Sequence, residues 1–145
     1  MALNAAGGLP TRNFQEGFFA GAENISAQRL KETILQGGEG CFACPIRCKR
    51  VVKSSGEVNI DPTYGGPEYE TLAALGSNCG VDDLLMVSKG NELCNSLGLD
   101  TISAGVSISF AMECFEKGYL SSSQIGYELP FGDGKSMVRM IEQIA

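Results

Sequence analysis

Three cysteines crowded into residues 41–48 are the strongest chemical feature of the sequence. Cys41, Cys44 and Cys48 form a C-x₂-C-x₃-C run. Such short spacings let successive thiolates reach one polynuclear cluster without long closing loops, and a [4Fe–4S] cluster takes four cysteines. Positive charge beside the run would stabilise an anionic cluster. The sequence supplies it at three positions: Arg47, Lys49 and Arg50. The run therefore predicts an iron–sulfur site with three of its four ligands present.

The remaining cysteines leave other interpretations open. A structural zinc prefers four ligands in two close pairs, whereas this sequence has a triple and no histidine. Spacing alone allows Cys79, Cys94 or Cys114 to complete an iron–sulfur set, although Cys94 and Cys114 fall at apolar helical positions typical of core residues. Two alternative functions follow: an iron–sulfur electron-transfer module without its own catalysis, and a zinc-stabilised interaction domain.

Helical periodicity dominates the elements that must position these cysteines. We expect a mainly α fold, an irregular multi-helical domain with one small β-hairpin. The hairpin would pair residues 50–53 with 57–60. The predicted helices run from the Ser26 N-cap to Gly37-Gly38, over 67–75, from Asp82-Asp83 to Gly98, from 101 or 103 to 117, and from Asp133 to the end, with a further cap at 121–123.

The segments outside these helices suggest how the chain is organised. Residues 1–24 are rich in Gly and Asn and lack a period, so we expect a linker-like segment running over a surface. The helix over 101–117 is apolar on most sides, which predicts that it is buried. The last helix shows no C-cap at Ala145. We therefore expect residues 1–145 to be part of one domain, cut at both ends from a longer protein.

Composition narrows the function classes. The 145 residues are 43% hydrophobic and 19% charged, which suits one domain with a real core. The net charge is −6 and the basic residues form no stripe, so nucleic acid is not an expected partner. No run of the sequence is apolar and long enough to predict a membrane span, and no secretory leader is evident. The expected location is the cytoplasm.

Several motifs in a fixed order resemble the aldehyde ferredoxin oxidoreductases. The motifs are GCFACPIRC at 40–48, GPEYET at 66–71, GSNCG at 76–80 and LGLDTIS at 97–103. Three shorter ones also fall in the family's order: LPTRN at 9–13, AME at 111–113 and EKG at 116–118. The resemblance covers nearly the whole chain, and ordered motifs are far more specific than any one of them.

The resemblance implies a much longer enzyme, in which a β-rich domain and two helical domains enclose a tungsten, or molybdenum, held by two pterins. These residues would belong to its central helical part. Cys41, Cys44 and Cys48 would bind the [4Fe–4S] cluster, and the fourth ligand would lie in a C-terminal segment outside this chain. Cys79 and the two later cysteines would then be structural.

The resemblance also assigns roles to a corner and to two carboxylates. The family binds its pterins with D-x-x-G-L-(C/D) segments, which implies pterin contacts for Asn95, Gly98, Leu99 and Asp100. Asn95 departs from the pattern because an amide cannot present a carboxylate. Without the other motifs, this stretch reads as an ordinary helix end, glycine turn and helix start.

A glutamate near the tungsten is implied as proton donor or acceptor, and Glu68 and Glu70 are the candidates, with Glu68 preferred. Either could instead stabilise a helix N-terminus electrostatically. In the full-length enzyme the implied reaction oxidises an aldehyde with water to a carboxylic acid and sends two electrons to ferredoxin. A homodimer is possible, and the fragment alone is expected to be inactive and to lack some or all cofactors.

Overall fold

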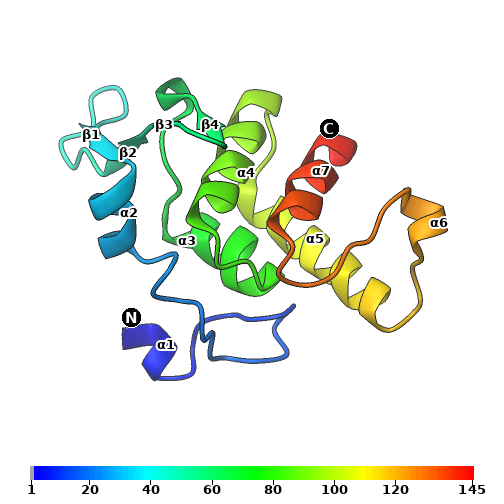
Figure 1. The fold of residues 1–145 in the computed structure, drawn as a ribbon. Coiled ribbons are helices and arrows are strands. Elements are labelled where there is room, and N and C mark those ends of the chain that lie inside the picture. Colours follow the sequence, from blue (N-terminus) through cyan, green and yellow to red (C-terminus); the bar gives the residue numbers. More distant parts are fainter. Residues whose placement is uncertain (1) are drawn as a thin grey trace.

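Two long helices and the corner between them organise the fold (Figure 1). The computed structural model describes residues 2–145. Helix α4 (Leu84–Leu97) begins after Asp83, whose carboxylate accepts hydrogen bonds from the first amides of the helix, and it ends at Gly98, which has a φ of 74°. Helix α5 (Thr101–Glu116) follows directly. Both predicted helices are confirmed, because aspartate caps and left-handed glycines are strong local boundary signals.

Helix α7 (Gly134–Ile144) completes the centre by packing against α4. It begins after the Asp133 N-cap, as predicted, and the short helix α6 (Ser122–Ile125) precedes it. Side chains from these helices and from the preceding segment have no exposed surface and pack in one cluster. They include Leu75, Val87, Cys94, Ile108, Met112, Met137 and Ile141. Burial of this apolar surface is the main stabilising contribution to the domain.

The segment that precedes α4 is less regular than the predicted helix over 67–75. Helix α3 (Tyr69–Thr71) is a single turn, and it continues as the π-helix η2 (Leu72–Gly76) and the 3₁₀-helix η3 (Ser77–Cys79). Another 3₁₀ turn, η1 (Pro62–Tyr64), lies before it. The prediction was therefore wrong in both its bounds and its type. The reason is tertiary, because α5 packs directly against η2 and η3.

The small strands also differ from the predicted hairpin. Helix α2 (Ala27–Thr33) ends earlier than expected, and the chain continues as strand β1 (Leu35–Glu39), which pairs antiparallel with β2 (Lys49–Val52). Strands β3 (Ser54–Ser55) and β4 (Asn59–Ile60) form a second, smaller sheet. Thus residues 59–60 pair with 54–55, and the predicted pairing of 57–60 with 50–53 was wrong. The prediction that Gly37-Gly38 ends the helix was wrong, because both glycines lie within β1, where pairing with β2 keeps the backbone extended.

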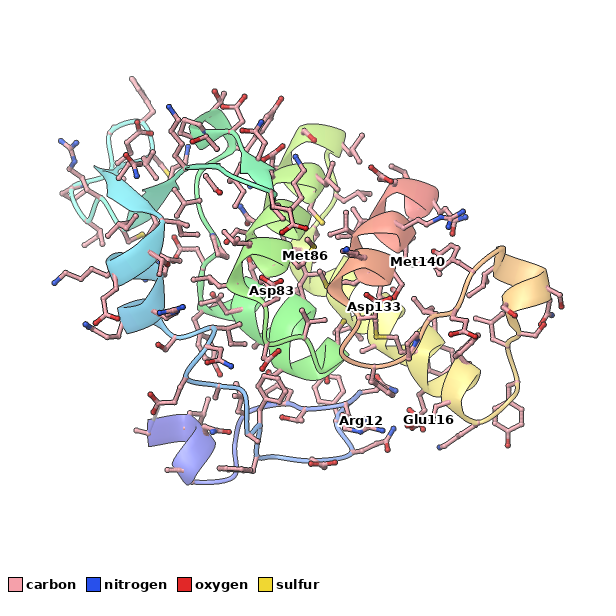
Figure 2. The ribbon with its side chains drawn as sticks, viewed as in Figure 1. Arg12, Asp83, Met86, Glu116, Asp133 and Met140 are labelled. Carbon is pink, nitrogen blue, oxygen red and sulfur yellow. The ribbon has the colours of Figure 1, made fainter. Side chains whose placement is uncertain are left out.

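The N-terminal segment docks on the helices (Figure 2). After α1 (Ala2–Ala5), it runs without regular structure, and its Leu9 and Thr11 are buried. Arg12 points toward Glu116 at the end of α5 and forms an ion pair with it. Its guanidinium also lies 4.6 Å from the ring centre of Phe131. The predicted lack of periodicity is seen, but the segment is anchored by specific contacts.

The fold class is mainly α, as the sequence predicts, with two small two-stranded sheets. The expectation that α5 is buried on most sides was wrong, because Ile102 is 47% exposed and Phe110 is 60% exposed. None of the helices over residues 2–145 combines the length and apolarity that a membrane crossing requires. One apolar side of α5 is therefore covered by the domain core, and the other is open.

Candidate metal and cofactor site

The cysteine run forms the loop between β1 and β2. The antiparallel ladder pairs Gly38 with Arg50 and Glu39 with Lys49, so it holds the two ends of the loop together. Within the loop, the amide of Cys44 donates a hydrogen bond to the carbonyl of Cys41 over 3.0 Å, which closes a turn. The sheet therefore acts as a base from which residues 41–48 project.

Two residues of this loop have left-handed backbones without being glycine. Ala43 has a φ of 58° and Arg47 a φ of 51°, and each immediately precedes a cysteine. A side chain in this region costs roughly 1–2 kcal/mol, so such residues persist only where surrounding structure enforces them. The strain sets the direction of the chain entering Cys44 and Cys48. It is therefore associated with the placement of two thiols.

The three thiols of the loop are free and accessible. Cys41 and Cys48 are exposed and Cys44 is half-buried. Cys41 and Cys44 line a cavity of about 470 Å³ together with Arg47. Among residues 2–145, no three Cys, Asp or Glu side chains are gathered around a point where they could hold one metal ion. A [4Fe–4S] cluster makes a different demand, since each of its irons takes one cysteine sulfur. Accessible sulfur donors in a short loop are chemically suited to it.

The predicted positive charges near the loop divide into two kinds. Arg47 lines the cavity itself. Lys49 is instead paired with Glu39 at 3.8 Å, and Arg50 forms an ion pair with Glu68. Arg47 is thus the cation of the three placed to act on a charge in the cavity.

The two candidate carboxylates lie in different surroundings. Glu68 is the N-cap residue of α3, without a side-chain capping bond, and its carboxylate is held by Arg50. Glu70 lies in the first turn of α3, is exposed, and lines a second pocket of about 230 Å³. The Glu68 carboxylate is therefore bound to Arg50 on β2, which follows the cysteine loop, and the Glu70 carboxylate faces an open pocket.

The predicted pterin corner is built from two helix caps. The amide of Leu99 donates to the carbonyl of Cys94 over 2.8 Å, and Gly98 supplies the left-handed residue of the turn. Asp100 caps α5 by accepting a hydrogen bond from the amide of Ser103 at 2.7 Å, and this bond lowers the pKa of its carboxyl below the ordinary value.

Of the four predicted corner residues, Leu99 is turned inward and packs against the core. The side chains of Asn95 and Asp100 are exposed, and Gly98 is exposed between them. The amide nitrogen of Asn95 donates to the carbonyl of Tyr64 over 2.9 Å. Asn95 therefore has a local structural role, whereas the Asp100 carboxylate is exposed at the corner.

A chain of contacts joins the three predicted motifs. The cysteine loop leads into Arg50, which binds Glu68 at the start of α3. At the end of α3, the hydroxyl of Thr71 lies 2.9 Å from the hydroxyl of Thr101, the first residue after the corner. The cysteine loop, the P-E-Y-E-T segment and the pterin corner are therefore brought together in the fold, although they are dispersed in sequence.

The other cysteines have structural surroundings. The Cys79 thiol is buried, lies 3.3 Å from the carbonyl of Ala74 and 3.5 Å from that of Gly105, and has a pKa raised by burial. Burial, with the charge of Asp100 nearby, raises the pKa of Cys94 to about 11. Both side chains belong to the hydrophobic core cluster, which is a structural position. The spacing-based option that one of them completes the cluster gains no support.

Sequence reasoning gave no role to the N-terminal residues beside the second pocket. That pocket lies between α3–η2 and α5 and is also lined by Pro10 and Phe14. The LPTRN motif at 9–13 marks this stretch in the sequence. Nothing in its composition indicated that it would pack next to Glu70.

Comparisons with known proteins agree with these motifs. Residues 1–145 match the family model for aldehyde ferredoxin oxidoreductase, domains 2 & 3. The chain is 43% identical to the tungsten-containing aldehyde ferredoxin oxidoreductase of Thermococcus kodakarensis and 40% identical to that of Pyrococcus furiosus, over 99% of this chain and 23% of each relative. It is also 27% identical to the aliphatic sulfonate oxidoreductase, WOR-like subunit, of Pyrococcus furiosus, over 93% of this chain and 22% of that protein.

The chain thus spans 23% or less of the length of these relatives. The match covers all of the motifs on which the resemblance was based, from 9–13 to 116–118. The resemblance is confirmed: the chain belongs to the aldehyde ferredoxin oxidoreductase family.

Proposed function

We propose that this chain is the part of a tungsten enzyme that connects an iron–sulfur cluster to a pterin site. The whole protein would oxidise an aldehyde, with water, to a carboxylic acid and release two electrons and two protons. When bound, the tungsten-pterin would take up the two electrons and the [4Fe–4S] cluster would carry them to ferredoxin. The observation that supports this proposal is the continuous link from the cysteine loop through Arg50–Glu68 and Thr71–Thr101 to the corner at Asp100.

Each motif contributes a distinct function within this proposal. Cys41, Cys44 and Cys48 would bind three irons, and the fourth ligand would come from another part of the full-length polypeptide. Arg47 lines the same cavity and would stabilise the negative charge of a cluster there. The exposed thiols also suit the reducing cytoplasm, where free cysteines persist.

The corner would hold a polar ring from the pterin. The exposed Asp100 carboxylate can accept hydrogen bonds from such a ring. The inward position of Leu99 fixes the corner against the core. Asn95 would contribute less, because its amide nitrogen is already bonded to Tyr64.

Glu70 is our choice for the proton donor or acceptor. Glu68 is paired with Arg50, which would hold its side chain in place, whereas Glu70 borders an open pocket. The contacts thus reverse the sequence-based preference for Glu68. A carboxylate that borders a reaction site can take up one of the two protons released by the oxidation.

The test uses the full-length protein, purified without oxygen. Wild type is expected to contain about four irons and one tungsten per chain and to show the broad visible absorption of a cluster. Serine replacement of Cys41, Cys44 or Cys48 is expected to remove most of the iron. Cys114→Ser serves as the matched control, since that half-buried cysteine lies outside the loop, and it is expected to retain the iron.

Activity separates the proposed function from the two alternatives. Wild type should oxidise aldehydes with ferredoxin or a redox dye as acceptor. Glu70→Gln should lower kcat by roughly 100-fold without loss of iron or tungsten. An intact cluster with no tungsten and no aldehyde oxidation would instead identify an electron-transfer module. A colourless protein with one zinc would identify a zinc-stabilised interaction domain.

A further inference from the structure

The cavity of about 470 Å³ at the cysteine loop is bordered by one cation and one anion. Arg47 and Glu39 line it together with Cys41 and Cys44. The other lining residues are Gly40, Ala43 and Pro45. Few side chains therefore decide the charge at the place where a cluster would lie.

The anion at this cavity has a partner on the neighbouring strand. Glu39 lies opposite Lys49 in the β1–β2 ladder, and their charged groups are 3.8 Å apart. Among the ion pairs formed within residues 2–145, none involves Arg47. The unbalanced charge at the cavity is therefore the guanidinium of Arg47.

The backbone at Arg47 is of a kind that favours glycine. Its φ of 51° lies in the left-handed region, which glycine adopts without steric cost. Other residues in this region are strained, and such residues persist where the fold enforces them and cluster at functional sites. A long cationic side chain at such a position indicates that the side chain itself has a role.

Gly40 leaves room for the side chain of Arg47. A Cβ atom on Gly40 would lie 2.8 Å from the Cγ of Arg47 and 3.3 Å from its Cα. The aliphatic stem of Arg47 therefore packs against bare backbone at Gly40. Because Gly40 precedes Cys41 and Arg47 precedes Cys48, this contact joins the two ends of the cysteine loop. It keeps the Arg47 side chain at the cavity.

We propose that Arg47 raises the reduction potential of the iron–sulfur cluster and that Glu39 lowers it. The inference rests on the proposed function, because it concerns the cluster held by the three loop cysteines. The two electrons released by aldehyde oxidation would pass through this cluster to ferredoxin one at a time. Each electron adds one negative charge to the cluster while it is reduced. A cation at the cavity stabilises the reduced form, and an anion destabilises it.

Coulomb's law gives the expected size of the effect. A unit charge about 10 Å from a redox group, at an effective dielectric constant of about 20, changes the equilibrium constant for reduction roughly tenfold. Both Arg47 and Glu39 are exposed, so water and salt weaken their effect. We expect a change of roughly fivefold for either residue, which is about 40 mV for a one-electron couple.

The test measures the cluster potential in the full-length protein, purified without oxygen. A redox titration is followed by the electron paramagnetic resonance signal of the reduced cluster, and iron is counted in each variant. Arg47→Gln is expected to lower the potential by about 40 mV, or roughly fivefold in the equilibrium constant for reduction. Arg47→Lys should recover most of that loss, because it restores the positive charge.

Removal of the anion should shift the potential in the opposite direction. Glu39→Gln leaves Lys49 as a second unbalanced cation, so the potential should rise by a similar amount. Ala43→Gly is the matched control for the strain of the loop, because Ala43 also has a left-handed backbone, with a φ of 58°, and carries no charge. It should leave the potential unchanged. A merely structural role for Arg47 would not produce shifts of opposite sign.

The inference and the proposed function fail in different ways. Equal potentials in wild type, Arg47→Gln and Glu39→Gln would overturn the inference but leave the cluster assignment intact. Shifts of the same sign in the two variants would also overturn it, because they would report a disturbed loop. If Arg47→Gln fails to retain iron, Glu39→Gln decides alone, and an unchanged or lowered potential there counts against the inference. A wild-type full-length protein without a [4Fe–4S] cluster would sink the proposed function itself.

Discussion

The hydroxyl groups of Thr71 and Thr101 lie 2.9 Å apart and form the hydrogen bond that joins the P-E-Y-E-T segment to the predicted pterin corner at 95–100. Thr71 is 4% exposed, so its hydroxyl has little access to water. The bond connects the end of α3 to the first residue of α5, close to both the proposed proton acceptor Glu70 and Asp100. It therefore fixes the relative positions of two motifs that are separate in sequence.

Removing one of these hydroxyls should be more harmful than removing both. Thr71→Val or Thr101→Val leaves the other hydroxyl without its partner, which is expected to cost about 1–2 kcal/mol of local stability. The double variant removes both polar groups and should cost clearly less than the sum. Denaturant unfolding of the two single variants and the double variant measures this difference. Additive losses would mean that the two hydroxyls do not interact.

The ion pair between Arg50 and Glu68 should hold the cysteine loop against α3. Both side chains are partly exposed, so Arg50→Gln is expected to cost only about 0.5 kcal/mol in unfolding free energy. Its larger effect should be local, as faster amide hydrogen exchange at residues 41–48. Lys53→Gln is the control, because it removes a charge just beyond β2.

Exchanging the two charges of the ion pair gives a second test of its effect on the loop. Arg50→Glu combined with Glu68→Arg should recover most of the exchange protection that Arg50→Glu alone loses. Equal exchange rates in wild type and in Arg50→Gln would show that the β1–β2 ladder alone orders the loop.

Thiol reactivity should divide the cysteines into two groups. In the cluster-free full-length protein, iodoacetamide is expected to modify the exposed Cys41 and Cys48 within minutes at pH 8 and Cys44 somewhat more slowly. Cys94 should react far more slowly, since its thiol is buried and its pKa is raised to about 11. Cys79 should behave in the same way, because burial raises its pKa.

Reconstitution with iron and sulfide is then expected to protect the three loop cysteines without changing Cys79 or Cys94. Mass spectrometry of the labelled peptides gives the rate at each position. Fast labelling of the loop cysteines in reconstituted protein would count against their role as ligands.

The parts of the fold that could be predicted from the sequence are those with local signals. The Asp83 and Asp133 carboxylates each accept a hydrogen bond from a nearby backbone amide, and the Gly98 amide donates to the carbonyl of Cys94, so each sets a helix boundary locally. The cysteine run and the corner at 95–100 were recognisable for the same reason, because their spacing is contained in a short stretch.

The parts that could not be predicted depend on distant contacts. The π-helix η2 arises where α5 packs on it at Gly105, and no residue of η2 indicates this contact. The left-handed run that ends at Phe14 is enforced by Ser77 and Asn78, far along the chain. Local propensity disfavours both conformations, so the pocket that they enclose was missed.

Asp100 should make the start of α5 sensitive to acid. Its hydrogen bond from the Ser103 amide lowers the carboxyl pKa in the folded protein below the ordinary value of 3.8. A group whose folded pKa is lowered stabilises the fold fully above its unfolded pKa, and it loses that contribution as the pH falls through the folded pKa. Between pH 7 and 5 the cap should therefore be complete, and it should weaken below about pH 4.

Amide hydrogen exchange at residues 101–105, corrected for the intrinsic pH dependence, measures this loss. Asp100→Asn should retain most of the capping at pH 7 because an asparagine oxygen accepts the same bond, and it should remove the acid sensitivity. Asp100→Ala should lower protection roughly fivefold at pH 7. The helix α7, capped by Asp133, provides an internal reference that neither variant should alter. Identical acid profiles in wild type and Asp100→Asn would rule out the Asp100 carboxyl as the titrating group.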